Sequence, residues 1–132
     1  VERSRGLGDV YKRQGLTITE PSDIRELYQD ILGMDIRNKF TLKQNIASQI
    51  FHREQDIEVI VGTIGNLSIE LFLSEEKSDV LWDHLCIVSE NRQALIATCR
   101  SKGFPVTVIE RDPFDIVFIR DRSGNNFEIK QK

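Results

Sequence analysis

The chain has 132 residues, of which 39% are hydrophobic and 30% are charged, and its formal net charge is −3. This length suits one domain with a real core, and this composition is typical of a folded globular protein. The acidic balance argues against nucleic acid as a partner, because phosphate binding needs a basic surface. No apolar run is long enough to cross a bilayer, so we expect no membrane partner. Two cysteines without metal-binding spacing favour a reducing, cytoplasmic setting.

The first fourteen residues are interpreted as foreign to the domain. Residues 9–14, DVYKRQ, can be back-translated into DNA that resembles the mosaic end of a transposase adapter used for sequencing libraries. A metagenomic gene read from a truncated start would carry such a scar, so residues 1–14 are left out of the fold prediction. The alternative is a natural N-terminal extension. We assign the domain to residues 15–132, with module one over 15–74 and module two over 82–132.

Module one opens with a short β-prone run over residues 15–19, followed by a predicted helix over 22–32. Ser22 is the expected N-cap, and Gly33 ends the helix. Between them an apolar stripe repeats at intervals of three and four residues, as in a helix that packs on a sheet. The stripe consists of Ile24, Leu27, Tyr28, Ile31 and Leu32.

The rest of module one predicts three strands and a second, short helix. The strands cover residues 34–41, 57–63 and 67–73, and a tight turn at Gly65-Asn66 joins the last two. The short helix covers residues 43–51, with Thr41 as a possible cap. Its side chains expected to face inward are Ile46, Ile50 and Phe51. A polar linker over 74–79 follows.

Module two repeats this pattern, with a strand over 84–88, a helix over 91–102 and strands over 106–109, 114–120 and 126–130. Leu95 and Cys99 are expected on the inner face of the helix. Thr19-Glu20 precedes Gly33 by the interval that separates Ser89-Glu90 from Gly103. Hairpin-like turns favour antiparallel pairing over an open parallel sheet. The sequence therefore predicts an α+β fold in which two βαβββ modules form a curved, mixed eight-stranded sheet. A ferredoxin-like α+β sandwich is the alternative.

Two stretches carry a resemblance to a known family. Residues 26–34, ELYQDILGM, resemble the helix end that opens glyoxalase and bleomycin-resistance domains. Residues 121–128, DRSGNNFE, resemble the closing hairpin of these domains, except that Arg122 stands where proline is common. Over residues 15–132 the chain thus resembles the vicinal-oxygen-chelate superfamily, which includes extradiol dioxygenase-like domains. The resemblance implies a glyoxalase-like sheet, a small-molecule substrate and a homodimer.

The resemblance also implies a divalent metal ion, Zn²⁺, Ni²⁺, Mn²⁺ or Co²⁺, held at equivalent strand positions of the two modules. Glu70, His84 and Glu128 occupy three of these positions. Glu70 lies in an apolar strand, where a buried unpaired carboxylate is costly and a cation would satisfy it. Aligning Glu20 with Glu90 gives Gln14 as the fourth ligand, whereas aligning the strand faces gives Arg13. The alternative is that both glutamates simply face solvent and that His84 is an ordinary strand residue.

Two functions follow from this resemblance. The first is a metal-dependent lyase or isomerase of glyoxalase or epimerase type, which stabilises an enediolate or enolate while Glu128 moves the proton. A glutamate at position 70 favours this branch over the dioxygenases, which use two histidines and one carboxylate. The second is a non-catalytic protein that sequesters a small molecule or drug in the same cleft. His52 is expected to be exposed, Trp82 to cover the seam between modules, and Cys86 to be a small core residue.

Overall fold

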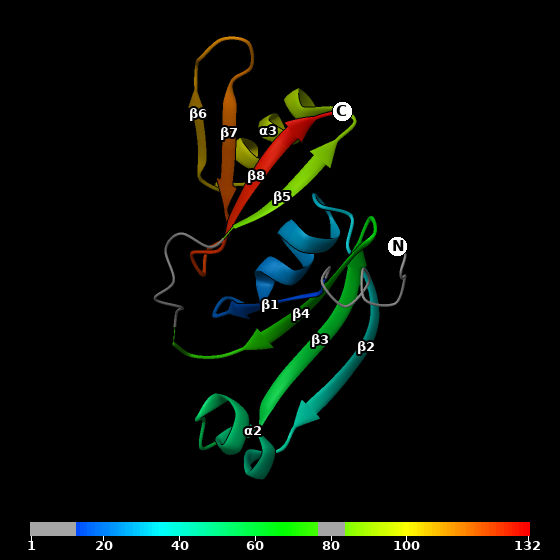
Figure 1. The fold of residues 1–132 in the computed structure, drawn as a ribbon, viewed down its shortest axis with the longest axis vertical. Helices are drawn as coiled ribbons and strands as arrows, with labels where there is room; N and C mark the ends of the chain where they lie inside the picture. Colours follow the sequence, from blue (N-terminus) through cyan, green and yellow to red (C-terminus); the bar gives the residue numbers. More distant parts are fainter. Residues whose placement is uncertain (1–12, 77–83) are drawn as a thin grey trace, which may run out of the picture.

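The fold consists of two modules, each built on a four-stranded sheet (Figure 1). This computed structural model describes residues 13–76 and 84–132. The first sheet has the strand order β1-β4-β3-β2, and its strands are β1 (Arg13–Ile18), β2 (Asp35–Leu42), β3 (Ile57–Ile64) and β4 (Leu67–Leu73). The second sheet has the order β5-β8-β7-β6, and its strands are β5 (His84–Ser89), β6 (Val106–Ile109), β7 (Ile116–Arg120) and β8 (Asn126–Gln131).

The two sheets share one topology. In each, the first strand pairs in parallel with the last, and the remaining neighbours are antiparallel. The predicted α+β fold of two equivalent βαβββ modules is therefore confirmed. The eight strands differ from the expected arrangement in one respect, because within the described residues they form two separate sheets and not one continuous sheet.

The first helix, η1 (Ile24–Gln29), is a π-helix. Its backbone bonds span five residues, as from the amide of Leu32 to the carbonyl of Leu27 at 2.8 Å. The predicted apolar stripe is confirmed, since four of its members are buried and Ile31 packs against them. The predicted capping by Ser22 is wrong. Asp23 occupies the cap position without a capping bond, because its carboxylate is buried against Arg122 instead.

One hydrophobic core joins the two modules. Helix η1, the blue coil in Figure 1, lies between the two sheets and contributes Leu27 and Tyr28, both with no exposed surface. The second sheet contributes Phe127 and Ile129, which are equally buried. The Tyr28 and Phe127 rings meet edge to face, with centroids 5.8 Å apart. The position of module two is therefore fixed by side chains of the module-one helix.

Helix α2 (Gln44–Phe51) confirms the predicted second helix, but its predicted inward residues are wrong. Ile46, Ile50 and Phe51 are 43%, 60% and 46% exposed. Ala47 is the buried residue of this helix. Helix α2 lies at one end of the first sheet (Figure 1), so little of its surface can be covered. It packs there through the small Ala47 side chain and an edge contact of Phe51 with Phe72.

Helix α3 (Arg92–Ser101) follows the predicted pattern. Asn91 caps it, since its side-chain oxygen accepts a hydrogen bond from the amide of Ala94 at 3.1 Å. Ile96 and Cys99 are buried against the second sheet, and Gly103 ends the segment with φ +81°. Among the residues described, no helix has the length and apolarity needed to cross a membrane.

The buried thiol of Cys99 predicts a loss of stability at alkaline pH. Burial raises the pKa of Cys99 from about 9 to about 11. The unfolded thiol therefore loses its proton at lower pH than the folded one, and stability falls as pH rises through this window. The expected loss is about 2–3 kcal/mol. Urea unfolding of Cys99→Ala at about pH 8 and pH 11 should show a flatter profile than the wild type.

The exposed Cys86 provides the matched control for this experiment. A Cys86→Ala variant should keep the wild-type slope, because it removes an exposed side chain and leaves the buried Cys99 in place. An unchanged slope in Cys99→Ala would contradict the assignment of the effect to the buried thiol.

Candidate functional site

The candidate site lies on the face of the second sheet that is turned away from the core. Leu85 and Phe127 are register partners and face the core, so the next pair, Cys86 and Glu128, faces the opposite side. His84 and Asn126 form the preceding pair on that same side. Cys86 is exposed, and its predicted core position is wrong because strand alternation places it beside Glu128.

His84 and Glu128 lie close together on this face. His84 Nε2 is 3.7 Å from Glu128 Oε1, and the side chains are 42% and 25% exposed. The imidazole also meets the Phe118 ring edge to face, with centroids 5.2 Å apart. An imidazole nitrogen and a carboxylate oxygen are both ligand atoms that divalent first-row cations bind. The chain therefore supplies two metal-compatible donors from adjacent strands.

An open hollow of about 550 Å³ lies beside this pair, and we call it the Arg120 hollow. Arg120 Nε donates a hydrogen bond of 2.8 Å to Asn126 Oδ1 at its edge. The hollow is lined by His84, Pro105, Thr107, Phe118, Ile119, Arg120 and Asn126. A small molecule that enters the hollow thus contacts His84 directly.

Glu70 lies on the first sheet, away from this pair. It pairs in register with Gly15 of β1 and Val61 of β3, and it is half-buried. Its neighbours Ile69 and Leu71 face the core, so Glu70 faces the other side of the sheet. Within residues 13–76 and 84–132, no three His, Cys, Asp or Glu side chains gather as a metal-binding group. A single chain therefore does not bring Glu70 to His84 and Glu128.

Gln14 and Glu70 lie on opposite faces of the first sheet. Gln14 pairs in register with Ile69, and its amide Nε2 makes a long bond of 3.5 Å to the Gly15 carbonyl. The register also relates the two modules, because Gly15 faces Glu70 as Cys86 faces Glu128. By this register, backbone position 13 corresponds to His84. This register agrees with the face-based alignment, and both candidates for the fourth ligand stay predictions.

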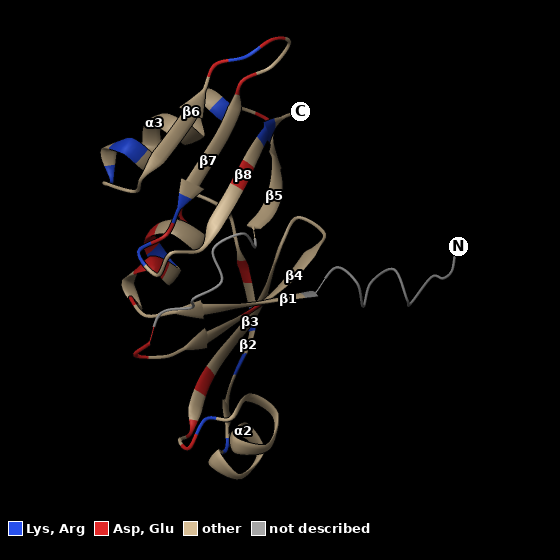
Figure 2. Cartoon of the chain, turned by 60° about the vertical axis from the view of Figure 1, so that its left-hand side comes forward, with Lys and Arg blue, Asp and Glu red and all other residues tan. Residues whose placement is uncertain are grey.

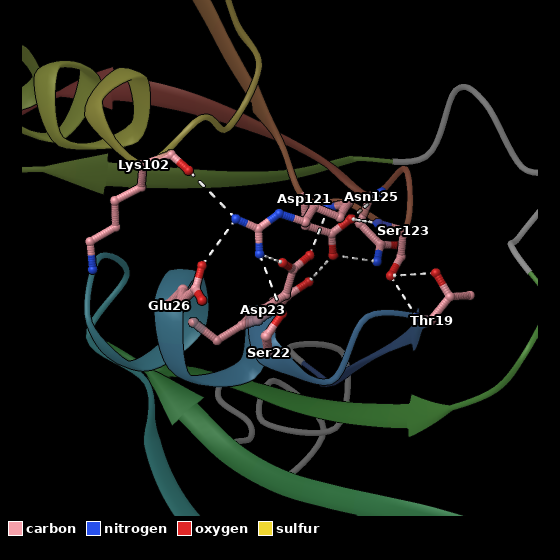
Figure 3. Close-up of polar contacts among 10 residues, drawn as sticks. Thr19, Ser22, Asp23, Glu26, Lys102, Asp121, Ser123 and Asn125 are labelled. Carbon is pink, nitrogen blue, oxygen red and sulfur yellow. Dashed lines mark hydrogen bonds and ion pairs between the residues drawn. The ribbon is translucent and has the colours of Figure 1, made fainter.

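A buried polar cluster ties module one to the hairpin before β8 (Figure 3). Asp23 has no exposed surface, and its carboxylate accepts bonds from Arg122 Nη1 at 2.8 Å and from the Arg122 amide at 2.7 Å. Arg122 Nη2 also donates to Glu26 at 3.0 Å, and the guanidinium lies 4.4 Å from the centre of the Phe104 ring. Burial raises the pKa of Asp23, whereas the Arg122 bonds lower it.

Asp121 organises the second half of this cluster. It is 2% exposed and accepts a 2.6 Å hydrogen bond from the Tyr28 hydroxyl. It also accepts bonds from the amides of Ser123 and Asn125 at 2.9 and 2.8 Å. Burial, and then the charge of Asp121, raise the pKa of Tyr28, so the phenol remains a donor. These bonds fix the turn that leads into β8, the strand that carries Glu128.

Comparison with known proteins identifies the family. A family model described as the Glyoxalase/Bleomycin resistance protein/Dioxygenase superfamily matches residues 12–129. The chain belongs to this superfamily. No curated protein matches the chain by sequence. Membership agrees with the repeated βαβββ topology and with the predicted vicinal-oxygen-chelate resemblance.

Solved structures of the superfamily show the same fold. The fosfomycin resistance protein FosX from Listeria monocytogenes matches with a TM-score of 0.69 and 10% identity, over 91% of this chain and 90% of that one. A mutant of FosX from Listeria monocytogenes, complexed with Mn(II) and 1S,2S-dihydroxypropylphosphonic acid, matches with a TM-score of 0.67 and 10% identity. The match covers 90% of this chain and 86% of that one. A glyoxalase family protein from Enterococcus faecalis matches with a TM-score of 0.63 and 16% identity, over 89% of this chain and 91% of that one. At these identities the likeness concerns the fold alone.

The remaining predicted residues fall outside this site. His52 is exposed, as predicted, and ends α2 with φ +56°. Trp82 lies outside the described residues. Arg120 as a site residue and the link between Arg122 and Asp23 were not predicted from the sequence. Arg122 in place of the proline common in the superfamily motif was the one available signal for that link.

Proposed function

We propose that the protein is a metal-dependent enzyme of glyoxalase or epimerase type that acts on a small substrate with neighbouring oxygens. The observation that carries this proposal is the close pair of His84 and Glu128, which lies on the face of the second sheet turned away from the core and beside the Arg120 hollow. The Mn(II) complex of the FosX mutant supports a divalent cation in this superfamily. Two free cysteines agree with a reducing, cytoplasmic setting.

The side chains present fit half of a metal site. His84 and Glu128 supply one nitrogen and one oxygen donor, and both remain partly open to solvent. A bound divalent cation would supply Lewis-acid stabilisation of the negative charge that develops on the substrate oxygens. Glu128 has a second carboxylate oxygen, which we assign to proton transfer at the substrate carbon. The Phe118 ring beside His84 restricts how that imidazole turns.

We further propose a homodimer in which a second copy completes the ligand set. Glu70 and the pair of His84 and Glu128 lie on sheet faces that are both turned away from the shared core. A twofold arrangement can place the first sheet of one copy over the second sheet of the other, and it then generates two equivalent sites. The exposed side chains of Phe40 and Val88, one on each of these sheets, favour such burial.

Calorimetric titration with Ni²⁺, Zn²⁺ and Mn²⁺ tests the metal site. Glu128→Gln and Glu70→Gln should each weaken binding by at least about tenfold, because a neutral amide replaces a charged ligand. Glu58→Gln is the matched control, since Glu58 is an exposed strand glutamate bonded to Thr41. If all three variants bind the metal ions with the same affinity as the wild type, that result would support the drug-sequestering alternative over the enzyme.

Mixing two defective variants tests the shared site. In a site built across two copies, a Glu70→Gln chain paired with a Glu128→Gln chain retains one intact site, so random mixing restores about a quarter of the sites. In a site built within one chain, mixing restores none. Because an arginine at position 13 cannot coordinate a cation, we also expect weak wild-type binding that Arg13→His strengthens more than Gln14→His.

A further inference from the structure

The guanidinium of Arg120 is held in place without a carboxylate partner in the described part of the chain. Arg120 ends β7, and its backbone amide donates to the Pro105 carbonyl at 3.1 Å. Its Nε donates to Asn126 Oδ1 at 2.8 Å, and no other side-chain bond of Arg120 occurs in residues 13–76 and 84–132. The Nε bond fixes the guanidinium plane and leaves both Nη groups to face the hollow or solvent.

Arg120 and His84 lie on either side of Asn126. The register pairs Asn126 with Arg120 on β7 and with His84 on β5, so all three share the sheet face that is turned away from the core. Two inter-strand spacings separate the backbones of Arg120 and His84 by roughly 9–10 Å. The Arg120 hollow of about 550 Å³ includes all three side chains in its lining. A small molecule in the hollow can therefore meet Arg120 at one end and His84 at the other.

The charge of this hollow differs from that of the protein around it. The chain carries 21 acidic and 18 basic residues, and in the view of Figure 2 the two signs are interspersed over both modules. Arg37, Arg53 and Arg122 have acidic partners, as in the 2.7 Å ion pair of Arg53 with Glu76, whereas Arg120 has none among the described residues. Among residues 13–76 and 84–132, the hollow is lined by Arg120, His84 and neutral side chains, without a carboxylate. Glu128 lies one register pair further, beside Phe118.

We propose that the Arg120 hollow binds the anionic group of a small ligand, a carboxylate or a phosphonate, and that Arg120 thereby sets the substrate class. A guanidinium presents parallel N–H donors that match the two oxygens of either group. This inference deepens the proposed function, because the same molecule would offer its reacting oxygens to His84 and Glu128. It predicts a substrate in which the anionic group is a few bonds away from those oxygens.

Titration of metal-free protein with methylphosphonate and, separately, with acetate tests this inference. Chemical shifts of the Arg120 Nε–H and of the backbone report the site of binding. The expected result is saturable binding that Arg120→Gln weakens by about tenfold, the value of a lost charged hydrogen bond. The two probes distinguish a phosphonate from a carboxylate as the preferred group. Dimethyl methylphosphonate, which carries no charge, should not bind.

Arg100→Gln is the matched control, because Arg100 is an exposed arginine on α3 and its removal changes the net charge equally. Arg100→Gln should retain wild-type binding. Equal weakening by both variants would mean non-specific charge attraction and would overturn the proposal, as would the absence of saturation in the wild type. Metal binding is measured separately, and Arg120→Gln should retain it. Failure of anion binding is thereby distinguished from failure of the metal site.

Discussion

Replacing Arg122 with methionine should destabilise the protein by about 2–4 kcal/mol, because the fully buried carboxylate of Asp23 loses its cationic partner. The partial exposure of Arg122, at 34%, keeps the value below that of a wholly buried pair. The measurement is urea unfolding at neutral pH, supported by a fall in Tm of about 10 °C. A loss below about 1 kcal/mol would contradict the assigned role of this ion pair.

The double variant with Asp23→Asn and Arg122→Met should recover most of this loss. An asparagine is neutral, and its side-chain oxygen can still accept the bond that the Arg122 amide donates to Asp23. The single Arg122→Met variant should also depend on pH. Since burial already raises the pKa of Asp23 above 3.8, its contribution to stability falls as pH rises above that value. Without Arg122 the pKa of Asp23 rises further, so the pH range over which stability is lost extends to higher pH. The Arg122→Met variant should therefore be destabilised more at neutral pH than near pH 4.

Replacing Gly62 with alanine should destabilise the protein by about 3 kcal/mol, because the new methyl group has no room. A Cβ at this position would lie 2.5 Å from the Asp35 carbonyl oxygen and 2.7 Å from the Met34 side chain. The carbonyl belongs to the neighbouring strand β2, next to an irregularity in its register between Ile36 and Asn38. The backbone therefore has to move, and thermal unfolding should show the loss.

Gly15→Ala provides the matched control on the same sheet. A Cβ at Gly15 meets only the edge of the Phe72 ring, at 3.1 Å, and this side chain can yield by a few tenths of an ångström. We expect a change of less than about 1 kcal/mol. Equal losses in the two variants would show that the backbone contact at Gly62 is not the cause.

Local elements of the fold were predictable because neighbouring residues determine them. Strands β4 (Leu67–Leu73) and β6 (Val106–Ile109) have the predicted bounds. The turn between β3 and β4 falls at Gly65, where φ is +59° and a glycine adopts the left-handed conformation without strain. The spacing of apolar residues in η1 identified the stripe that is buried, although the π-helical geometry was not expected.

The orientation of the short helix α2 was not predictable in the same way. Its apolar residues at positions 46, 50 and 51 have the spacing of an inward face, yet Ala47 is the buried residue and only Phe51 of the three adds a contact, with Phe72 of the first sheet. Periodicity tells which residues share a face, and it does not tell which partner covers that face. The same ambiguity made Cys86 look like a core residue, because alternation in β5 leaves open which set of side chains is inside.

The sequence by itself determined the two-module repeat and the strand and helix order, because periodicity and turn residues are properties of short segments. It named His84 and Glu128 as candidate donors only through the family resemblance. The tertiary structure decided that these two donors meet at 3.7 Å and that Glu70 lies on the other sheet. It also decided how the modules dock, through a bond between Arg122 and Asp23, 99 positions apart in the chain. Such contacts depend on how whole sheets pack around a shared core, which no local pattern encodes.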